Sequence, residues 1–426
     1  MLRTSKPLLT SKGQHHRQVR AAIFRRVAEL VESKSLTHAE AKSLTVGQLF
    51  RTARLLLKGN MSGTTLKAFS TVMDTLGKSI NVMTPTYAYQ LADVTLSGAF
   101  LNDIVLLRLE DFVSRESQQP DLPLLLHIAR AMTAVGYELA DPVRFGEVAA
   151  GVALKACSTS VDKNGYSAAL STLRLANCLA TLNCFPKDLL LKVFSIEFLG
   201  EIDQLLADTP LNTSEHGDSH KHRQNQQRDN GSLHSHIRET LMRLNRAVVL
   251  EAGLSDSFGG PWVDSIPWFH GKHHCSWEFY EGRMKGNATF REWNFKEHVR
   301  SNMERVVGER VDYFLLTDQM TPFYHWIDFE FMPVGSDLPN DVATQNSVCS
   351  PIAVLLLSYR QFIHCDQSSS SATNSGLKLR GSVKQVIRQL QILGYRVVTI
   401  NPSEWPTNQS EEAQLDMLRK LLFQNS

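Results

Sequence analysis

A change of apolar periodicity along the chain is the sequence feature that most constrains its fold. From residue 46 to residue 208, apolar residues recur at the three- and four-residue spacing of amphipathic helices. From residue 326 onward, short apolar runs alternate with helical segments, which is the pattern of an α/β unit. The sequence therefore predicts an α plus α/β fold, in which a helical region is followed by a small carboxyl-terminal α/β domain.

The helical region is expected over residues 46–208. Its amphipathic stretches cover residues 48–57, 86–97, 122–136 and 166–182. In the third of these, the apolar stripe consists of Leu122, Leu125, Leu126, Ala129, Met132 and Val135. Helix starts recur at intervals of roughly 35 to 45 residues, as in stacked helix pairs. We therefore expect a solenoid-like helical repeat, without a strict repeat consensus.

The α/β domain is expected over residues 326–426. Strands are predicted over residues 326–332, 351–357 and 396–400, and helices over 382–393 and 411–423. Gly394 follows the first of these helices, where a helix end favours a residue that tolerates positive φ. A Ser/Asn/Thr-rich insertion, residues 368–375, precedes that helix.

Two further segments differ in composition. Residues 1–45 form a basic leader, in which no acidic residue precedes Ala28 while Arg3, Lys6, Lys12, Arg17, Arg20, Arg25 and Arg26 are all basic. This composition predicts a mitochondrial transit segment, with a solvated basic tail as the alternative. Residues 209–236 are rich in His, Gln and Ser and poor in apolar residues, so a flexible linker is expected there. An amphipathic helix should begin at Ile237.

The overall composition excludes several classes of protein. Lys plus Arg number 45 and Asp plus Glu number 43, a formal charge of +2, which excludes a uniformly basic protein. No apolar run reaches the length of about 18 residues that a membrane span needs. The six cysteines form no CxxC pair, a usage typical of a reducing compartment.

Two passages resemble a known family. The run from Leu244 to Leu250, LNRAVVL, is followed by Ile266-Pro267-Trp268-Phe269-His270 and by Cys275. Together they resemble the middle region of the FASTK (Fas-activated serine/threonine kinase) family, here residues 237–325. The strand 352–357, the run Leu393-Gly394-Tyr395-Arg396-Val397-Val398 and Glu404-Trp405 resemble the RAP domain that ends those proteins. Ile327-Asp328-Phe329-Glu330 is similar to the strand that precedes this domain.

The resemblance implies a protein of the mitochondrial matrix that binds single-stranded RNA. It would act in processing, stability or translation of organellar transcripts, with other RNA-processing proteins as further partners. The RAP domain would resemble the PD-(D/E)xK nuclease fold, and the helical region would be a solenoid that runs along RNA.

Candidate RNA-binding residues lie in both regions. In the α/β domain, basic side chains opposite the apolar stripe of helix 382–393 are suited to phosphate, and aromatic rings nearby are suited to bases. The candidates there are Lys378, Arg380, Lys384, Arg388, Arg396 and Trp405. In the helical region, polar residues away from the apolar stripes are His127, Arg130, Arg174 and Asn177. The alternative is an ordinary solvated face with the aromatic rings in the core.

A metal-dependent nuclease is the enzymatic alternative. Asp328 and Glu330 alternate on one strand and could converge on Mg²⁺, but the next strand carries leucines where further acidic ligands are needed. We therefore predict no catalytic residue, with Asp328 and Glu330 as the weak candidates.

Other chemistry is not predicted. The chain has neither a glycine-rich phosphate loop nor the catalytic-loop motif of kinases, which excludes kinase activity and a nucleotide cofactor. His270, His273, His274 and Cys275 lie close in sequence, yet a zinc site usually draws on two separated clusters, so no metal is predicted. A helical scaffold that binds protein instead of RNA is the remaining alternative.

Overall fold

The computed structural model describes residues 41–58, 63–115, 120–158, 168–208, 223–254, 257–268, 290–334, 350–365, 377–402, 404–406 and 410–423. The chain divides into two compact units. Unit 1 comprises Met1–Asp141 and Ile363–Lys378, and unit 2 comprises Pro142–Phe362 and Leu379–Ser426. No helix in the described part is long and apolar enough to cross a membrane. The two units are described separately.

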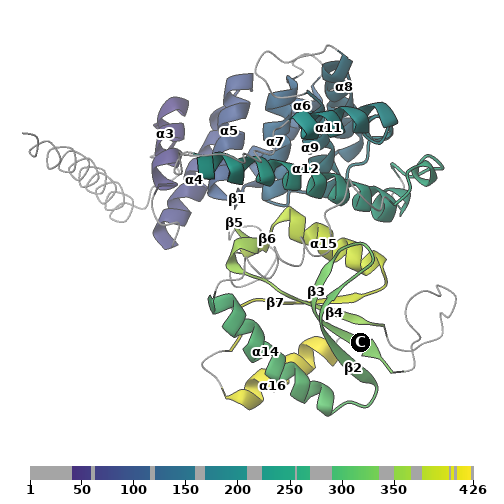
Figure 1. Cartoon of the computed structure of the whole chain (residues 1–426). Helices are drawn as coiled ribbons and strands as arrows, with labels where there is room; N and C mark the ends of the chain where they lie inside the picture. The colour runs from purple at the N-terminus through teal and green to yellow at the C-terminus, as the bar shows by residue number, and fades with distance from the viewer. Residues whose placement is uncertain are drawn as a thin grey trace, which may run out of the picture. The chain divides into compact units, whose positions relative to one another are not determined.

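Unit 1 is built mainly of helices. They are α3 (Val46–Leu56), α4 (Gly63–Ser79), α5 (Pro85–Gly98), α6 (Asp103–Ser114) and α7 (Leu122–Ala134). Helix α5 packs against α3 on one side and α7 on the other, so these three lie side by side (Figure 1). Helix α4 packs against α3 and α6. The buried faces follow the predicted apolar stripes.

Polar caps at the helix starts explain where these helices begin. The side chains of Thr45, Thr84, Asn102 and Asp121 each accept a hydrogen bond from a backbone N–H of the first turn. Such caps satisfy backbone donors that have no partner within the helix. A small sheet in the order β1-β5-β6 joins β1 (Phe100–Leu101), β5 (Phe362–Cys365) and β6 (Leu377–Leu379). The first two strands are parallel.

The first part of unit 2 is also helical. It contains α8 (Pro142–Ser158), α9 (Ala168–Thr181), α10 (Lys187–Val193), α11 (Ile196–Asp208) and α12 (Arg223–Glu251), with 3-10 turns η2 (Ala252–Leu254) and η3 (Val263–Ser265). Helix α9 packs against all four of the other helices. Helix α12 begins at Arg223, inside the segment that the sequence assigns to a linker.

The division of the chain at Asp141 falls within the predicted helical region, so the domain boundaries stay a prediction.

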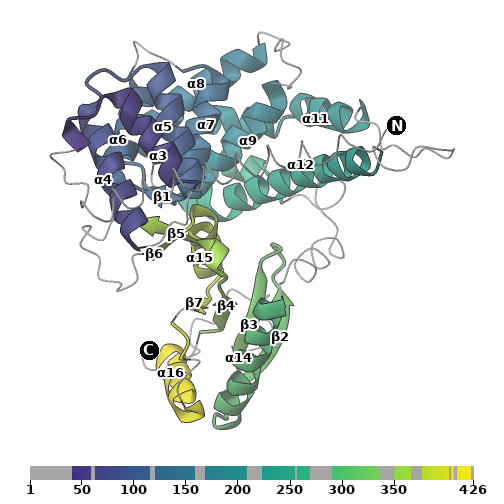
Figure 2. The ribbon, with the colours of Figure 1, turned by 90° about the vertical axis from the view of Figure 1, so that its left-hand side faces the viewer.

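The second part of unit 2 is an α/β layer. Its strands are β2 (Tyr313–Met320), β3 (Trp326–Pro333), β4 (Ile352–Leu356) and β7 (Arg396–Ile400), in the spatial order β2-β3-β4-β7. Strands β2, β3 and β4 are antiparallel neighbours, whereas β4 and β7 are parallel. The accompanying helices are α14 (Phe290–Gly308), the 3-10 turn η4 (Tyr359–Gln361), α15 (Gly381–Ile392) and α16 (Glu411–Phe423). Figure 2 shows the strands and helices of this layer in a view turned by 90° from that of Figure 1.

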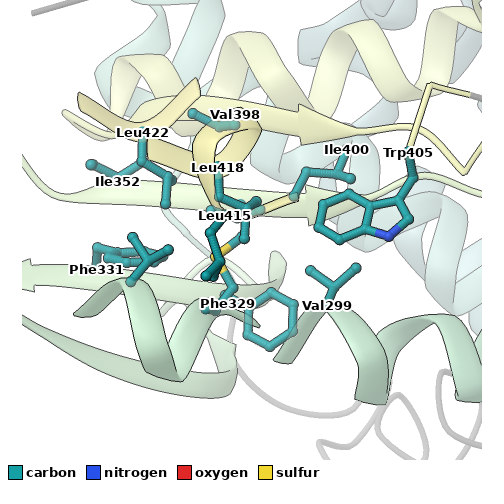
Figure 3. Packing of buried hydrophobic residues seen from close by; sticks show 13 residues of the cluster. Val299, Phe329, Phe331, Ile352, Val398, Ile400, Trp405, Leu415, Leu418 and Leu422 are labelled. Carbon is teal, nitrogen blue, oxygen red and sulfur yellow. The ribbon is translucent and has the colours of Figure 1, made fainter. Parts of the chain in front are cut away.

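Alternation along the strands supplies a core on each face of this sheet. Phe329 and Phe331 of β3 pack on one face with Val299 of α14 and Leu418 of α16 (Figure 3). The opposite face packs Ala353 and Leu355 of β4 against Val383 and Leu390 of α15. Helices α14 and α16 therefore cover one face and α15 covers the other. The predicted α plus α/β composition is confirmed.

Candidate nucleic-acid interface

Strand β4 leads directly into a turn that carries an exposed aromatic ring and an exposed arginine. Ser358 and Gln361 form a capping box around η4, with the Ser358 N–H donating to Gln361 Oε1 at 2.5 Å. Between them, the Tyr359 side chain is 65% exposed and Arg360 is also exposed. The cap fixes the turn, so both side chains project from a defined backbone.

The same turn is hydrogen-bonded to the start of α15. The N–H of Arg380 donates to the carbonyl of Gln361 at 2.9 Å. Arg380 is the N-cap residue, and its carbonyl accepts from the N–H groups of Val383 and Lys384 at 3.0 and 3.1 Å. Its side chain makes no cap hydrogen bond, and within the described residues its buried Nε has no hydrogen-bond partner. Tyr359, Arg360, Arg380 and Lys384 are hereafter the η4–α15 cluster.

The η4–α15 cluster combines basic side chains with an exposed aromatic ring. Guanidinium groups bind phosphate through charge-assisted hydrogen bonds, and the positive end of a helix dipole adds to this attraction. An exposed phenol ring offers a face on which a base can stack. The sequence identified Arg380 and Lys384, whereas it missed Tyr359 and Arg360. Their only sequence signal is an aromatic–basic pair directly after a buried strand.

Arg388, predicted to face phosphate, instead binds a buried carboxylate. It forms an ion pair with Glu251 at the end of α12, and Gln389 of α15 donates to the same carboxylate. Gln385 of α15 accepts a hydrogen bond from Thr181 Oγ1 at 3.2 Å. Burial raises the pKa of Glu251, and the adjacent guanidinium opposes that shift. The Arg388 charge is therefore paired with a buried carboxylate, while its side chain stays 30% exposed.

Two other predicted residues also have internal roles. Arg396 donates to the carbonyls of Leu421 and Leu422, the last turn of α16, where a cation complements the helix dipole. Trp405 is 3% exposed and lies in the core between sheet and helices (Figure 3). Its ring is in edge contact with Phe295. The prediction of base stacking at Trp405 is corrected, because the buried ring offers no face to a base. Lys378 lies on β6 and is half-buried.

Asp328 takes part in an ion cluster that the sequence did not reveal. Lys296 of α14 donates to Asp328 Oδ1 at 3.0 Å and also to Asp318 of β2. The second oxygen of Asp328 accepts from the N–H of Leu356 at 2.8 Å. Burial raises the pKa of Asp328, whereas Lys296 opposes this shift. The Lys296 ammonium thus lies between the carboxylates of Asp318 and Asp328.

Glu330 has a different hydrogen-bond partner from Asp328. It is 7% exposed and accepts a hydrogen bond from the Tyr395 hydroxyl at 2.7 Å. Burial, together with this carboxylate, raises the pKa of Tyr395. Across the described residues, no group of three His, Cys, Asp or Glu side chains is arranged to hold a metal ion. His270, His273, His274 and Cys275 lie outside the described residues.

The candidates of the helical region fall in both units. In unit 1, the His127 ring stacks on Tyr89 and Arg130 is exposed one turn later. In unit 2, Arg174 and Asn177 of α9 are half-buried, and the Asn177 carbonyl accepts from Thr181 Oγ1 at 2.9 Å. Tyr89 is the residue that sequence reasoning missed here.

Comparison with known proteins gives a consistent set of relatives. No family model matches the chain. Proteins described as "FAST kinase domain-containing protein 1, mitochondrial" from Xenopus tropicalis and Mus musculus are 27% identical over 268 and 267 residues, and the one from Homo sapiens is 26% identical over 266 residues. Each match covers 58% of this chain but only 26 to 27% of the relative, so the chain matches about a quarter of these proteins' length.

Proposed function

From an assignment to the FASTK family, which these relatives support, we propose that the chain is a mitochondrial protein that binds single-stranded RNA without cutting it. Its place would be the matrix, and its effect would be to protect organellar transcripts or present them to processing enzymes. The mitochondrial location is supported by the names of the relatives.

The observation that carries the proposal is the η4–α15 cluster. Tyr359 and Arg360 are exposed on a capped turn, and the Arg380 N–H joins this turn to the start of α15. An exposed aromatic ring and an exposed arginine on one turn, joined through the backbone to a second arginine, match the way in which single strands are held, by aromatic platforms along a positive surface. We propose that Arg360, Arg380 and Lys384 contact phosphate and that Tyr359 stacks on a base. Lys378, which belongs to unit 1, stays a separate candidate for a phosphate contact.

The same proposal assigns architecture to the two regions. The α/β layer with its preceding strand would be a RAP domain related to the PD-(D/E)xK fold, and the helices would form a solenoid-like repeat. The row of α3, α5 and α7, backed by α4 and α6, supports such a repeat in unit 1. His127, Arg130, Arg174 and Asn177 would then contribute RNA contacts along the helices.

Binding without cutting is supported by the state of Asp328. Both its oxygens accept hydrogen bonds from the protein, one from Lys296 and one from the backbone of β4. A hard divalent ion would have to displace the lysine from between Asp328 and Asp318. Strand β4 beside Asp328 carries Leu355 and Leu356 and supplies no further acidic residue. The protein-binding scaffold is the alternative that the following experiment tests, and the nuclease is the alternative that an assay of RNA cleavage tests.

The experiment is a salt titration of RNA affinity. Fluorescence anisotropy with an unstructured single-stranded RNA should show affinity that falls steeply as salt rises, because phosphate contacts release counterions. Arg360→Ala should lower the slope of log affinity against log salt by about 0.7, the value for one phosphate contact on a single strand. Arg300→Ala, which removes another surface arginine of unit 2, should leave the slope unchanged. Absence of binding, or binding indifferent to salt, would contradict the proposal.

A further inference from the structure

Unit 1 carries an aromatic pair on two neighbouring helices. Tyr89 of α5 and His127 of α7 are stacked, with ring centroids 4.5 Å apart and ring planes 16° from parallel. The Tyr89 side chain is 50% exposed, whereas His127 is half-buried. The Tyr89 ring is therefore the solvent-exposed member of the pair, and the His127 ring packs against it on the protein side.

The supporting ring is half-buried and uncharged at neutral pH. Within the described residues, His127 Nε2 is buried without a hydrogen-bond partner. Burial lowers the pKa of His127, and nearby Arg130 lowers it further, while Asp93 opposes them. Because the imidazole stays neutral at neutral pH, its contact with Tyr89 is a stack of two uncharged rings. A preformed stack of this kind loses little conformational entropy when a third ring is added.

The charges around the pair favour a polyanion. Arg54 of α3 lies 3.5 Å from Asp93 of α5, and both side chains are more than one-third exposed. Asp93 is one turn beyond Tyr89, and the exposed Arg130 is one turn beyond His127. The ion pair between Arg54 and Asp93 compensates the local acid, which leaves Arg130 as the net positive charge beside the rings. Arg130 of α7 is thus the cation beside the stack.

We propose that the Tyr89–His127 pair is a stacking site for one unpaired nucleobase of RNA, with Arg130 close to the adjoining phosphate. The inference rests on the proposed RNA-binding function and adds a second contact point, in a different unit from the η4–α15 cluster. A planar base can stack on the exposed Tyr89 ring as the third member of the stack, and bases of every kind can stack on an aromatic ring in this way.

The test is a thermodynamic cycle between Tyr89 and a base. Affinity is measured for the whole chain and for Tyr89→Ala, each with a single-stranded RNA and with the same RNA carrying abasic sites. Removal of Tyr89 should weaken binding of the intact RNA by about 5- to 150-fold. With abasic RNA the same substitution should have a smaller effect, because the stacking partner is already gone.

Conservative variants control for the fold. Tyr89→Phe keeps the ring and should bind RNA like the unaltered chain, and a circular dichroism melt shows whether Tyr89→Ala remains folded. If the unaltered chain binds RNA but Tyr89→Ala and abasic RNA show additive effects, this inference is overturned while the proposed function stands. If the unaltered chain does not bind RNA, the proposed function fails first. Loss of affinity in Tyr89→Phe equal to that in Tyr89→Ala would also overturn the stacking site.

Discussion

Arg388 of α15 forms an ion pair with Glu251, a buried carboxylate at the end of α12. Gln389 donates to the same carboxylate, so one face of α15 is held by polar contacts to the helical part of unit 2. Arg388, which the sequence predicts to face phosphate, with a solvated face as the alternative, thus makes an internal contact.

Glu251→Ala should destabilise the protein strongly. The substitution removes the carboxylate that Arg388 and Gln389 share. Breaking a buried pair costs on the order of 3 kcal/mol, and less here because the Arg388 side chain is 30% exposed. Urea unfolding should show a loss of about 1 to 3 kcal/mol. Glu304→Ala removes an exposed carboxylate paired with Arg300 and should change stability by about 0.5 kcal/mol or less. Equal effects of the two substitutions would show that the Glu251 contact does not hold α15.

His325 should make the protein less stable in acid. It is 2% exposed, and burial, with Arg246 nearby, lowers the pKa of its imidazole well below the ordinary value of 6.5. The unfolded chain therefore takes up a proton as pH falls below 6.5, whereas the folded protein resists it, and acid favours unfolding.

The measurement is the midpoint of urea unfolding at pH 7.5 and at pH 5.5. His325→Phe should reduce the difference between the two midpoints, because the variant has no proton to take up at this position. Other buried groups, such as Asp328 and Glu251 with raised pKa values, titrate equally in both proteins and cancel in the comparison. An unchanged pH dependence in the variant would disprove the role of His325.

Two glycines of α8 should respond to alanine in opposite ways. A Cβ at Gly146 would lie 2.6 Å from the Sγ of Cys184, whose thiol donates to the Pro142 carbonyl. Gly146→Ala should therefore cost about 1 to 3 kcal/mol through overpacking. A Cβ at Gly151 meets no atom within 4 Å, so Gly151→Ala should stabilise the helix by about 0.5 to 1 kcal/mol. Thermal unfolding of both variants checks the pair, and a stabilising Gly146→Ala would contradict the packing described.

Tyr359→Ala should weaken RNA binding without altering the salt slope. A stacked base contributes about 1 to 3 kcal/mol and releases no counterion, in contrast to Arg360. Tyr359→Phe should restore the affinity. Parallel salt titrations of the three proteins check this, and a Tyr359→Ala variant that changes the slope alone would show that the ring is not stacked on a base.

The sequence predicts most elements of the α/β layer because their patterns are local. Strand β7 and helix α16 have the predicted bounds, and β3 extends one residue beyond the prediction. Strand β2 was missed because only its first four residues form an apolar run, the next three are polar, and the strand follows α14 after a short turn. The early start of α12 was missed because its first residues are polar and its apolar stripe begins only at Ile237.

The candidate site was harder to predict than the fold because its residues come together only in three dimensions. A helical pattern shows that Arg388 is opposite an apolar stripe, but it cannot show that Glu251 of another helix faces it. Lys296 and Asp318 carry ordinary charges in the sequence, and only the packing of α14 on β2 brings both to Asp328. In the same way, only the packing of α5 on α7 brings Tyr89 onto the His127 ring.

The most direct test of the central claim is to incubate the purified chain with end-labelled single-stranded RNA, with and without Mg²⁺. Native and denaturing gels are then run in parallel. The account predicts a salt-sensitive shift on the native gel and intact RNA on the denaturing gel, with Mg²⁺ making no difference. Mg²⁺-dependent cleavage that disappears in Asp328→Ala would contradict it and identify a nuclease. Absence of both a shift and cleavage would contradict the account and would favour a protein-binding scaffold.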